Sequence, residues 1–249
     1  MLSFKKNCTI VDYKKKPNLK KNNKMKKMKL YTVVGFITIA GSAIKAQVTI
    51  GNSSNVGTPS PMVALNSGDI ESLDKVKKVN IIYDYSELGV GAFRKEEDYL
   101  NKRKEDFEKK KKPEDFEKFK TNWVNSRKER YEPKFEVLFN KEGGKVIDMT
   151  GTNYATSNAY TLLVRTVFIE PGVNIGIMKK PSYIDLEFVF KDKEGKELCV
   201  FYAKNMIGVQ AAGFDYDMGS RLVESYAKSA KMLVGAIKKE RKKAAKKKK

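Results

Sequence analysis

The residues that could carry out catalysis are few, because the 249-residue chain contains no histidine. Histidine is the commonest general base and metal ligand, so every triad and metal site that depends on it is excluded. Ser225-Tyr226-Ala227-Lys228 has the S-x-x-K spacing of penicillin-recognising serine enzymes. The S-D-N and K-T-G motifs that complete such a site are missing, and the sequence predicts that this motif lies in the middle of a helix. We therefore interpret it as part of that helix.

Carboxylates are the remaining groups for acid–base chemistry. Two acids that flank a glycosidic bond can hydrolyse it, and the acids that we would test for this role are Asp84, Glu87, Asp215 and Asp217. Asp215, Asp217 and Gly219 also have part of the spacing of a calcium loop, but calcium needs more oxygen ligands and a distal acid. Because a helix is predicted directly afterwards, we interpret these two acids as helix caps.

A glycine-rich turn follows the first predicted strand of the domain. Gly89-Val90-Gly91 could in principle cradle a phosphate, but the third glycine of such loops is missing. The following acids, Glu96, Glu97 and Asp98, would fill the first turn of a helix and repel an anion. We predict a plain turn here, and we assign no catalytic residue, cofactor or metal ligand anywhere in the chain.

The candidate binding residues form two groups. Trp123, Tyr131 and Arg165 are candidates for lining a pocket between the long helices and the sheet. The second group is a like-charge run at the C-terminus, Lys238–Lys249, which ends in Lys246, Lys247, Lys248 and Lys249. Such a run is typically solvated and disordered, and it could bind an anionic membrane surface or an anionic polymer of the cell envelope.

The net charge of +21 is concentrated at the two ends of the chain. Residues 1–46 carry 12 Lys and one Asp, and residues 238–249 carry nine basic residues and one Glu. The body between them has a net charge of only +2, which argues against a nucleic-acid-binding face on the folded domain. We therefore predict no specific nucleic-acid partner.

The N-terminal region has the organisation of a secretory signal peptide. A basic stretch at Lys24–Lys29 precedes an apolar run at Leu30–Ile44 and a small residue, Ala46, at the expected cleavage site. The apolar run is shorter than the roughly 20 residues that span a bilayer. Residues 1–46 are therefore predicted to be a signal peptide with an extended basic leader, and the protein to be exported to the periplasm, the outer membrane or beyond. Cys8 would leave with it, and Cys199 is predicted to be a buried, unreactive thiol.

The remaining elements predict an α+β domain at residues 76–237, between a flexible arm at 47–75 and a disordered tail at 238–249. Alternating apolar residues predict strands at Val76–Tyr85, Thr161–Ile169 and Tyr183–Lys191, the last forming an antiparallel hairpin with Leu198–Tyr202. In Thr161–Ile169, one face is predicted to carry Leu162, Val164 and Phe168, and the other Leu163, Arg165, Val167 and Ile169. Apolar residues on both faces suggest a strand that is covered on each side. Charged helices are predicted at Arg94–Lys112, at Glu114–Tyr131 and after Pro133. A closing helix is predicted at Arg221–Ile237, with one face that can cover the sheet: Leu222, Tyr226, Ser229, Leu233 and Ile237. The expected architecture is a mostly antiparallel sheet of about four to five strands, covered by the long helical insertion and the C-terminal helix.

Several stretches together resemble an uncharacterised family of small exported proteins from Gram-negative anaerobes. They are Tyr83-Asp84-Tyr85-Ser86-Glu87-Leu88, Arg130-Tyr131-Glu132-Pro133-Lys134-Phe135, Phe168-Ile169-Glu170-Pro171-Gly172, and Gly213-Phe214-Asp215-Tyr216-Asp217 followed by Arg221 and Glu224-Ser225-Tyr226-Ala227-Lys228. This resemblance implies no activity and no functional residues. The order of elements is also similar to envelope accessory domains such as the TolB amino-terminal domain and the curli secretion lipoprotein, although the lipid-attachment cysteine of that lipoprotein is absent here.

Three functions stay open at this point. The first is a non-enzymatic accessory protein of the cell envelope that docks another envelope component. The second is a periplasmic module that binds a small molecule or a glycan, and the third is a carboxylate-based hydrolase. A flat apolar surface would favour docking, an enclosed apolar pocket would favour ligand binding, and a polar pocket with two carboxylates would favour hydrolysis.

Overall fold

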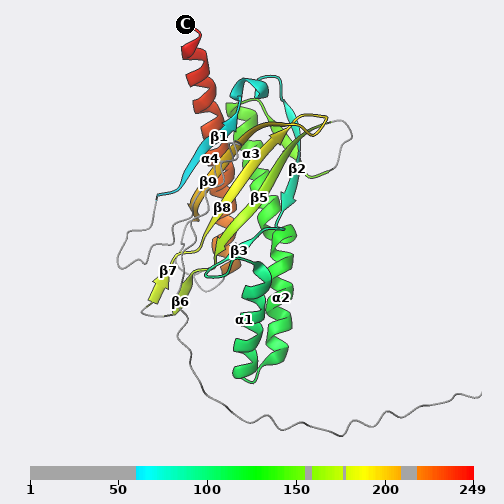
Figure 1. The fold of residues 1–249 in the computed structure, drawn as a ribbon, viewed down its shortest axis with the longest axis vertical. Coiled ribbons are helices and arrows are strands. Elements are labelled where there is room, and N and C mark those ends of the chain that lie inside the picture. Colours follow the sequence, from blue (N-terminus) through cyan, green and yellow to red (C-terminus); the bar gives the residue numbers. More distant parts are fainter. Residues whose placement is uncertain (1–59, 155–158, 176–177, 209–217) are drawn as a thin grey trace, which may run out of the picture. The chain divides into compact units, whose positions relative to one another are not determined.

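The computed structural model describes residues 60–154, 159–175, 178–208 and 218–249. The predicted signal peptide and two of the candidate acids, Asp215 and Asp217, lie outside these ranges. The described residues form a mixed seven-stranded sheet and its helices (Figure 1). The strands of this sheet are β1 (Met62–Gly68), β2 (Lys78–Asp84), β3 (Gly89–Val90), β4 (Thr150–Thr152), β5 (Tyr160–Glu170), β8 (Tyr183–Lys191) and β9 (Glu197–Ile207).

The antiparallel half of the sheet is centred on the predicted hairpin, which is confirmed as β8 and β9. Ile184, Leu186 and Phe188 alternate with half-buried polar residues, so one face of β8 packs into the core. β5 pairs antiparallel with the other edge of β8, and β1 pairs antiparallel with β9. A separate two-stranded ribbon follows β5, made of β6 (Val173–Ile175) and β7 (Met178–Lys180).

The other half of the sheet is parallel, which the sequence did not predict. β2 and β3 both pair parallel with β5, and β4 pairs parallel with β2, giving the order β1-β9-β8-β5-β2-β4. The predicted α+β class is confirmed, but the sheet is mixed and has seven strands, so the prediction of about four to five strands is too low. The glycine-rich stretch predicted as a plain turn contributes β3, whose Gly89 lies opposite Phe168.

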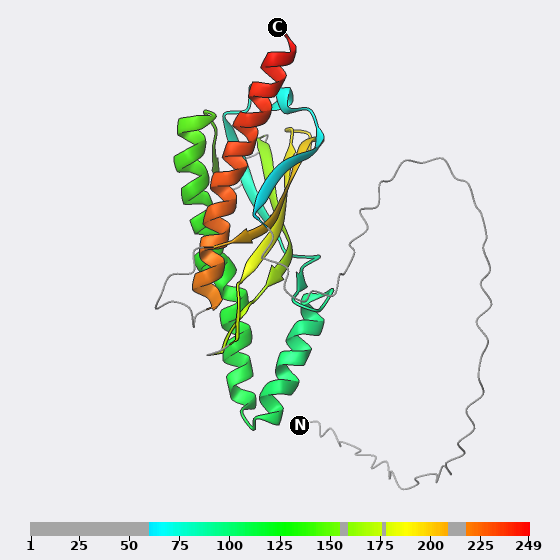
Figure 2. The same cartoon turned by 90° about the vertical axis from the view of Figure 1, so that its left-hand side faces the viewer.

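A β-bulge in β5 corrects the predicted faces of that strand. The register with β8 shifts between Thr166 and Phe168, so that Ile169 is buried with Leu162 and Val164, whereas Phe168 turns to the other face. Phe168 there packs against Tyr183, with ring centroids 5.8 Å apart. No helix among the described residues covers this second face (Figure 2). The prediction that β5 is covered on each side is therefore wrong, and its outer side chains are only half-buried.

Helices cover the opposite face of the sheet (Figure 2). They are α3 (Glu132–Val146) and α4 (Met218–Lys247), whereas α1 (Glu96–Lys109) and α2 (Pro113–Ser126) pair as a hairpin of their own. The predicted inward face of the closing helix is confirmed, because five of its side chains are fully buried: Leu222, Tyr226, Ser229, Leu233 and Ile237. Phe135 and Phe139 of α3 are also fully buried beneath the sheet.

Pro133 does not open a separate helix. Residues 113–146 are continuously helical, because a π-helical turn, η2 (Arg127–Tyr131), joins α2 to α3. In this turn the N–H of Glu132 donates to the carbonyl of Arg127, five residues back. Proline inside a helix lacks a donor and collides with the preceding turn, and the wider π-turn accommodates it.

The predicted flexible arm contains ordered structure. Met62–Gly68 is the edge strand β1, and Ile70–Leu73 is a 3₁₀ turn, η1, capped by the carboxylate of Asp69. Val63 lies opposite Ala203 of β9, and Leu65 lies opposite Phe201. Both side chains therefore pack against the core, and this pairing outweighs the turn-forming composition of the segment. The prediction of a flexible arm is wrong for these residues.

Candidate functional site

The C-terminal lysine run is helical. α4 continues to Lys247, so the prediction of a disordered tail at 238–249 is wrong for all but its last two residues. The buried stripe of α4 also continues past Ile237, because Arg241 and Ala244 follow Leu233 and Ile237 at helical spacing and are half-buried. The segment is held in place by contacts on this stripe.

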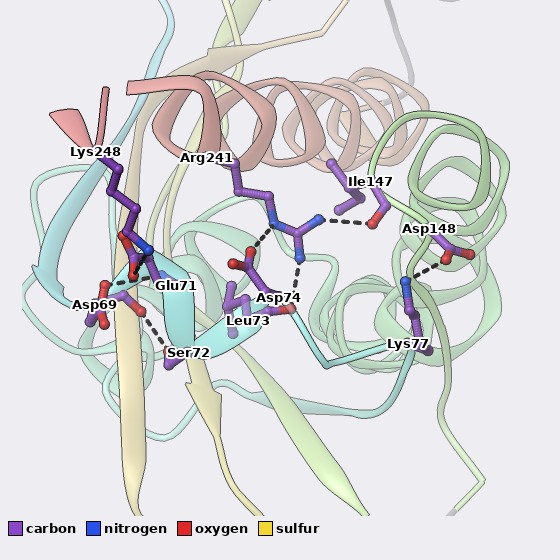
Figure 3. Close-up of polar contacts among 10 residues, drawn as sticks. All are labelled: Asp69, Glu71, Ser72, Leu73, Asp74, Lys77, Ile147, Asp148, Arg241 and Lys248. Carbon is purple, nitrogen blue, oxygen red and sulfur yellow. Dashed lines mark hydrogen bonds and ion pairs between the residues drawn. The ribbon is translucent and has the colours of Figure 1, made fainter. Parts of the chain in front are cut away.

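Arg241 is the main anchor of this segment (Figure 3). Its guanidinium donates to the carbonyl of Leu73 in η1 at 2.7 Å and to the carbonyl of Ile147, after α3, at 2.9 Å. Its Nε lies 3.3 Å from a carboxylate oxygen of Asp74. One side chain therefore joins three segments that are far apart in the sequence.

Two ion pairs flank this anchor (Figure 3). Lys248 contacts the carboxylate of Glu71 in η1 at 2.6 Å, and Lys77 contacts Asp148 at 2.5 Å. Both pairs are largely solvent-exposed, so each contributes little to stability. The pair with Glu71 shows that Lys248 points toward the 3₁₀ turn and away from the lysines on the other side of the helix.

The opposite side of the same helix carries a row of exposed lysines, which we call the lysine face: Lys238, Lys239, Lys242, Lys243 and Lys246. With Gly235 they line a shallow hollow of about 380 Å³. A Cβ on Gly235 would meet nothing within 4 Å apart from its chain neighbours and the backbone of its own helix, so the hollow is open above that backbone. The helix fixes the spacing of the backbone positions that carry these lysines, so the lysine face is a candidate surface for anions. Of the four C-terminal lysines predicted to bind, Lys246 belongs to this face.

Trp123 and Tyr131, predicted as pocket residues, do line a common cavity of about 650 Å³, which we call the aromatic cavity. It lies between the α1–α2 hairpin, the start of the β6–β7 ribbon and the start of α4. Its lining consists of Tyr99, Arg103, Phe119, Asn122, Trp123, Ser126, Glu129, Arg130, Tyr131, Pro171, Gly172, Met218 and Gly219. Three of its rings pack together, with the centroid of Trp123 lying 5.3 Å from that of Tyr99 and 6.3 Å from that of Phe119.

Arg165, the third predicted pocket residue, does not line this cavity. It lies on the face of the sheet that no described helix covers, opposite Asp84 of β2 and Glu187 of β8. Its guanidinium contacts these carboxylates at 2.9 Å and 2.5 Å. Burial works to raise the pKa of Asp84, but the N–H of Ser86 and the Arg165 guanidinium outweigh it and hold that pKa below its ordinary value. The three residues form an ion-pair row across three strands.

A second cavity, of about 800 Å³, was not predicted. It lies between β2 and the π-turn, and its walls include Tyr83, Tyr85, Arg127 and Glu132. The guanidinium of Arg127 lies 4.4 Å from the ring centroid of Tyr85. Burial raises the pKa of Glu132 above its ordinary value, a feature often found at functional sites. The one signal in the sequence was Pro133, since a proline within a helical pattern marks a local irregularity.

None of the three hollows described above is lined by Asp84, Glu87 or Ser225, and Asp215 and Asp217 lie outside the described residues. Asp84 is engaged by Arg165, and Glu87 is exposed in a turn. Ser225 is fully buried, and its hydroxyl accepts a hydrogen bond from the N–H of Gly208 at 3.0 Å, which gives the S-x-x-K serine a structural role.

Within the described ranges, no group of three or more Cys, Asp or Glu side chains could hold a metal ion. No helix in the same ranges is long and apolar enough to cross a membrane.

Comparisons with known proteins show one distant likeness. No protein-family model matches the chain, and no curated protein matches its sequence. Among solved structures, the PelC dodecamer from Paraburkholderia phytofirmans is similar, with a TM-score of 0.33 and 12% sequence identity. The match covers 70% of this chain and 97% of the PelC chain. A likeness at this level carries no argument about function, so the functional case depends on the surfaces described above.

Proposed function

We propose that this protein is an exported, non-enzymatic accessory protein of the cell envelope, which docks an anionic envelope polymer along the lysine face of α4. The observation that carries this proposal is the docking of the C-terminal segment by Arg241. A disordered lysine tail would lose conformational entropy on binding, whereas the helix already holds its lysines in one direction.

The dimensions of the lysine face suit a linear polymer. Lys228 and Lys231 precede Gly235 on the same side of the helix, and Lys246 lies near its end. At a rise of about 1.5 Å per residue, the row from Lys228 to Lys246 is about 27 Å long. Several negative groups of an extended polyanion can therefore contact one row of ammonium groups at the same time.

A lipid surface fits α4 less well. A helix that lies in a bilayer interface inserts apolar side chains next to its basic ones. The apolar stripe of α4, which includes Leu233 and Ile237, is instead fully buried against the sheet and α3. The lysine face therefore offers charge without an apolar group to insert, and we expect attachment to be electrostatic and sensitive to salt.

The proposed location depends on the predicted signal peptide, which lies outside the described residues. Cleavage after Ala46 would leave a chain that begins at Gln47 and is released in the periplasm, where it could associate with the outer membrane. Mass spectrometry of the exported protein tests this step, because it identifies the first residue directly. An intact N-terminus, or protein found only in the cytoplasm, would contradict export.

The binding step is tested with two variants of equal charge. The lysine-face variant replaces Lys238, Lys239, Lys242 and Lys246 by Gln, and the matched variant replaces four exposed lysines of the α1–α2 region, Lys104, Lys110, Lys112 and Lys120, by Gln. Binding to long-chain polyphosphate and to phosphatidylglycerol vesicles is measured for both.

We expect the lysine-face variant to lose most of its affinity for polyphosphate while the matched variant keeps it. Equal losses in the two variants would mean that only the total charge matters, and would refute a defined binding face. Tighter binding to the vesicles than to polyphosphate would show that the partner is a membrane and not a polymer. A version truncated after Ile237 is a poorer test, because it also removes Arg241 and its contacts.

A further inference from the structure

We propose that the aromatic cavity is a binding site for a small, flat ligand that carries one anionic group, such as a carboxylate. This site is separate from the lysine face and does not depend on the proposed polymer binding. Its volume of about 650 Å³ lies within the range of about 300–1,000 Å³ that is usual for small-molecule sites.

The rings of the cavity provide the flat surface. Trp123 and Phe119 are stacked with an interplanar angle of 24°, and Tyr99 packs against both. The indole N–H of Trp123 donates to the carboxylate of Glu96, which also binds Arg127. This contact holds the indole in one orientation, so the aromatic wall is formed before a ligand arrives.

Arg103 provides the charge. Its guanidinium lies 5.0 Å from the ring centroid of Phe119 and 5.3 Å from that of Phe107, so one face of the cation is covered by aromatic rings. Its Nε is buried, and it has no hydrogen-bond partner among the described residues. The two terminal nitrogens of a guanidinium can bind a carboxylate with two parallel hydrogen bonds, and this does not require the buried Nε.

Two acids of α1 are already engaged by other residues. Asp106, one turn along α1 from Arg103, pairs with Lys102, and Glu96 binds Trp123 and Arg127. Two other charged residues line the cavity, Glu129 and Arg130, and Arg130 donates to the hydroxyl of Ser220. An anionic group on the ligand would therefore match a cation that the described part of the chain leaves without an ion pair.

Two related dyes test this site in the full chain. Anilinonaphthalene sulfonate is flat and anionic, and phenylnaphthylamine has the same rings without the sulfonate. Trp123 is the one tryptophan of the chain, so quenching of its fluorescence reports binding next to this side chain. We expect the anionic dye to quench Trp123 at saturation with a single affinity, and the neutral dye to bind more weakly.

Three variants separate the cavity from general surface charge. Arg103→Gln should weaken the anionic dye about tenfold or more and leave the neutral dye unchanged, because only the sulfonate contacts Arg103. Arg103→Lys keeps the charge without the two-pronged geometry, so its affinity should be intermediate; this variant also serves if Arg103→Gln does not fold. Lys104→Gln removes the same charge from an exposed neighbour outside the cavity lining and should change nothing.

The proposal is overturned by any of three results. The first is equal affinity of the anionic dye for the wild type and Arg103→Gln. The second is an equal loss in Lys104→Gln, which would reduce the effect to surface charge. The third is dye binding without quenching of Trp123, which would place the dye elsewhere. None of these results affects the lysine face, because that face is tested with a different ligand and different residues.

Discussion

Replacing Arg241 by Gln should destabilise the fold and release the end of α4. The wild-type guanidinium makes hydrogen bonds of 2.7 Å and 2.9 Å to two backbone carbonyls, and 22% of the side chain is exposed. A hydrogen bond from a charged donor typically contributes about 1.5–3 kcal/mol when it is buried. Partial exposure lowers this value, and the contact with Asp74, whose side chain is 59% exposed, adds little.

We therefore expect Arg241→Gln to lower the free energy of unfolding by about 2–3 kcal/mol. For a domain of this size, that loss corresponds to a fall in melting temperature of roughly 5–10 °C. Arg241→Lys should lose about half as much, because a lysine is a point charge that cannot reach both carbonyls with the same geometry.

The assay is urea unfolding followed by circular dichroism, with Lys242→Gln as the control. Lys242 is the next residue on the helix and is exposed, so its replacement should change the free energy of unfolding by less than about 0.5 kcal/mol. If Arg241→Gln is as stable as Lys242→Gln, Arg241 does not anchor the C-terminal helix, and the argument for a fixed lysine face fails.

Three further predictions follow from particular contacts. Gly235→Ala should raise the free energy of unfolding by about 0.5–1 kcal/mol in a urea titration, because the added methyl group meets nothing within 4 Å apart from its chain neighbours and the backbone of its own helix, and glycine weakens a helix interior. A loss of stability would show that the helix is not regular there. Asp84→Asn should cost about 1 kcal/mol at pH 7. Because the folded-state pKa of Asp84 is lowered, its contribution is present above the unfolded pKa and lost as the pH falls through the folded one, so the cost should shrink below about pH 3.8. A cost that is independent of pH would refute the ion-pair row. In a Cys8→Ser background, Cys199 should not react with a thiol reagent until the protein unfolds, since the side chain is fully buried and burial raises its pKa to about 12. Rapid modification of the native protein would contradict this burial.

The local patterns in the sequence predicted the antiparallel hairpin and the buried stripe of α4. Ile184, Leu186 and Phe188 alternate with polar residues, and Leu233 and Ile237 repeat at helical spacing, so each element shows which face is buried. The pairing of two strands that follow each other across a short turn can be predicted from these local patterns alone. The parallel pairing of β2 with β5 had no such local signal, because α1, α2 and α3 lie between these strands in the sequence.

The missed features depend on contacts between distant segments. β1 is rich in turn-forming residues, but Val63 and Leu65 alternate, and this pattern was a sign of a strand with one buried face. The C-terminal run was predicted to be disordered because of its like charges. Arg241 and Ala244 nevertheless continue the spacing of the buried stripe, and this spacing indicated a helix. The two cavities could not be predicted as such, because their walls come from several elements and no short motif connects them.

The salt dependence of polyphosphate affinity tests the central claim most directly. Each phosphate contact made by a lysine releases counterions, and in nucleic acids this gives a slope of about 0.7–0.9 in log affinity against log salt. The lysine-face variant lacks four of these contacts, so the magnitude of its slope should be about 3 units below that of the wild type. The matched variant should keep the wild-type slope. If both variants lose the same slope, the anion contacts are spread over the whole surface, and α4 does not provide a defined docking face.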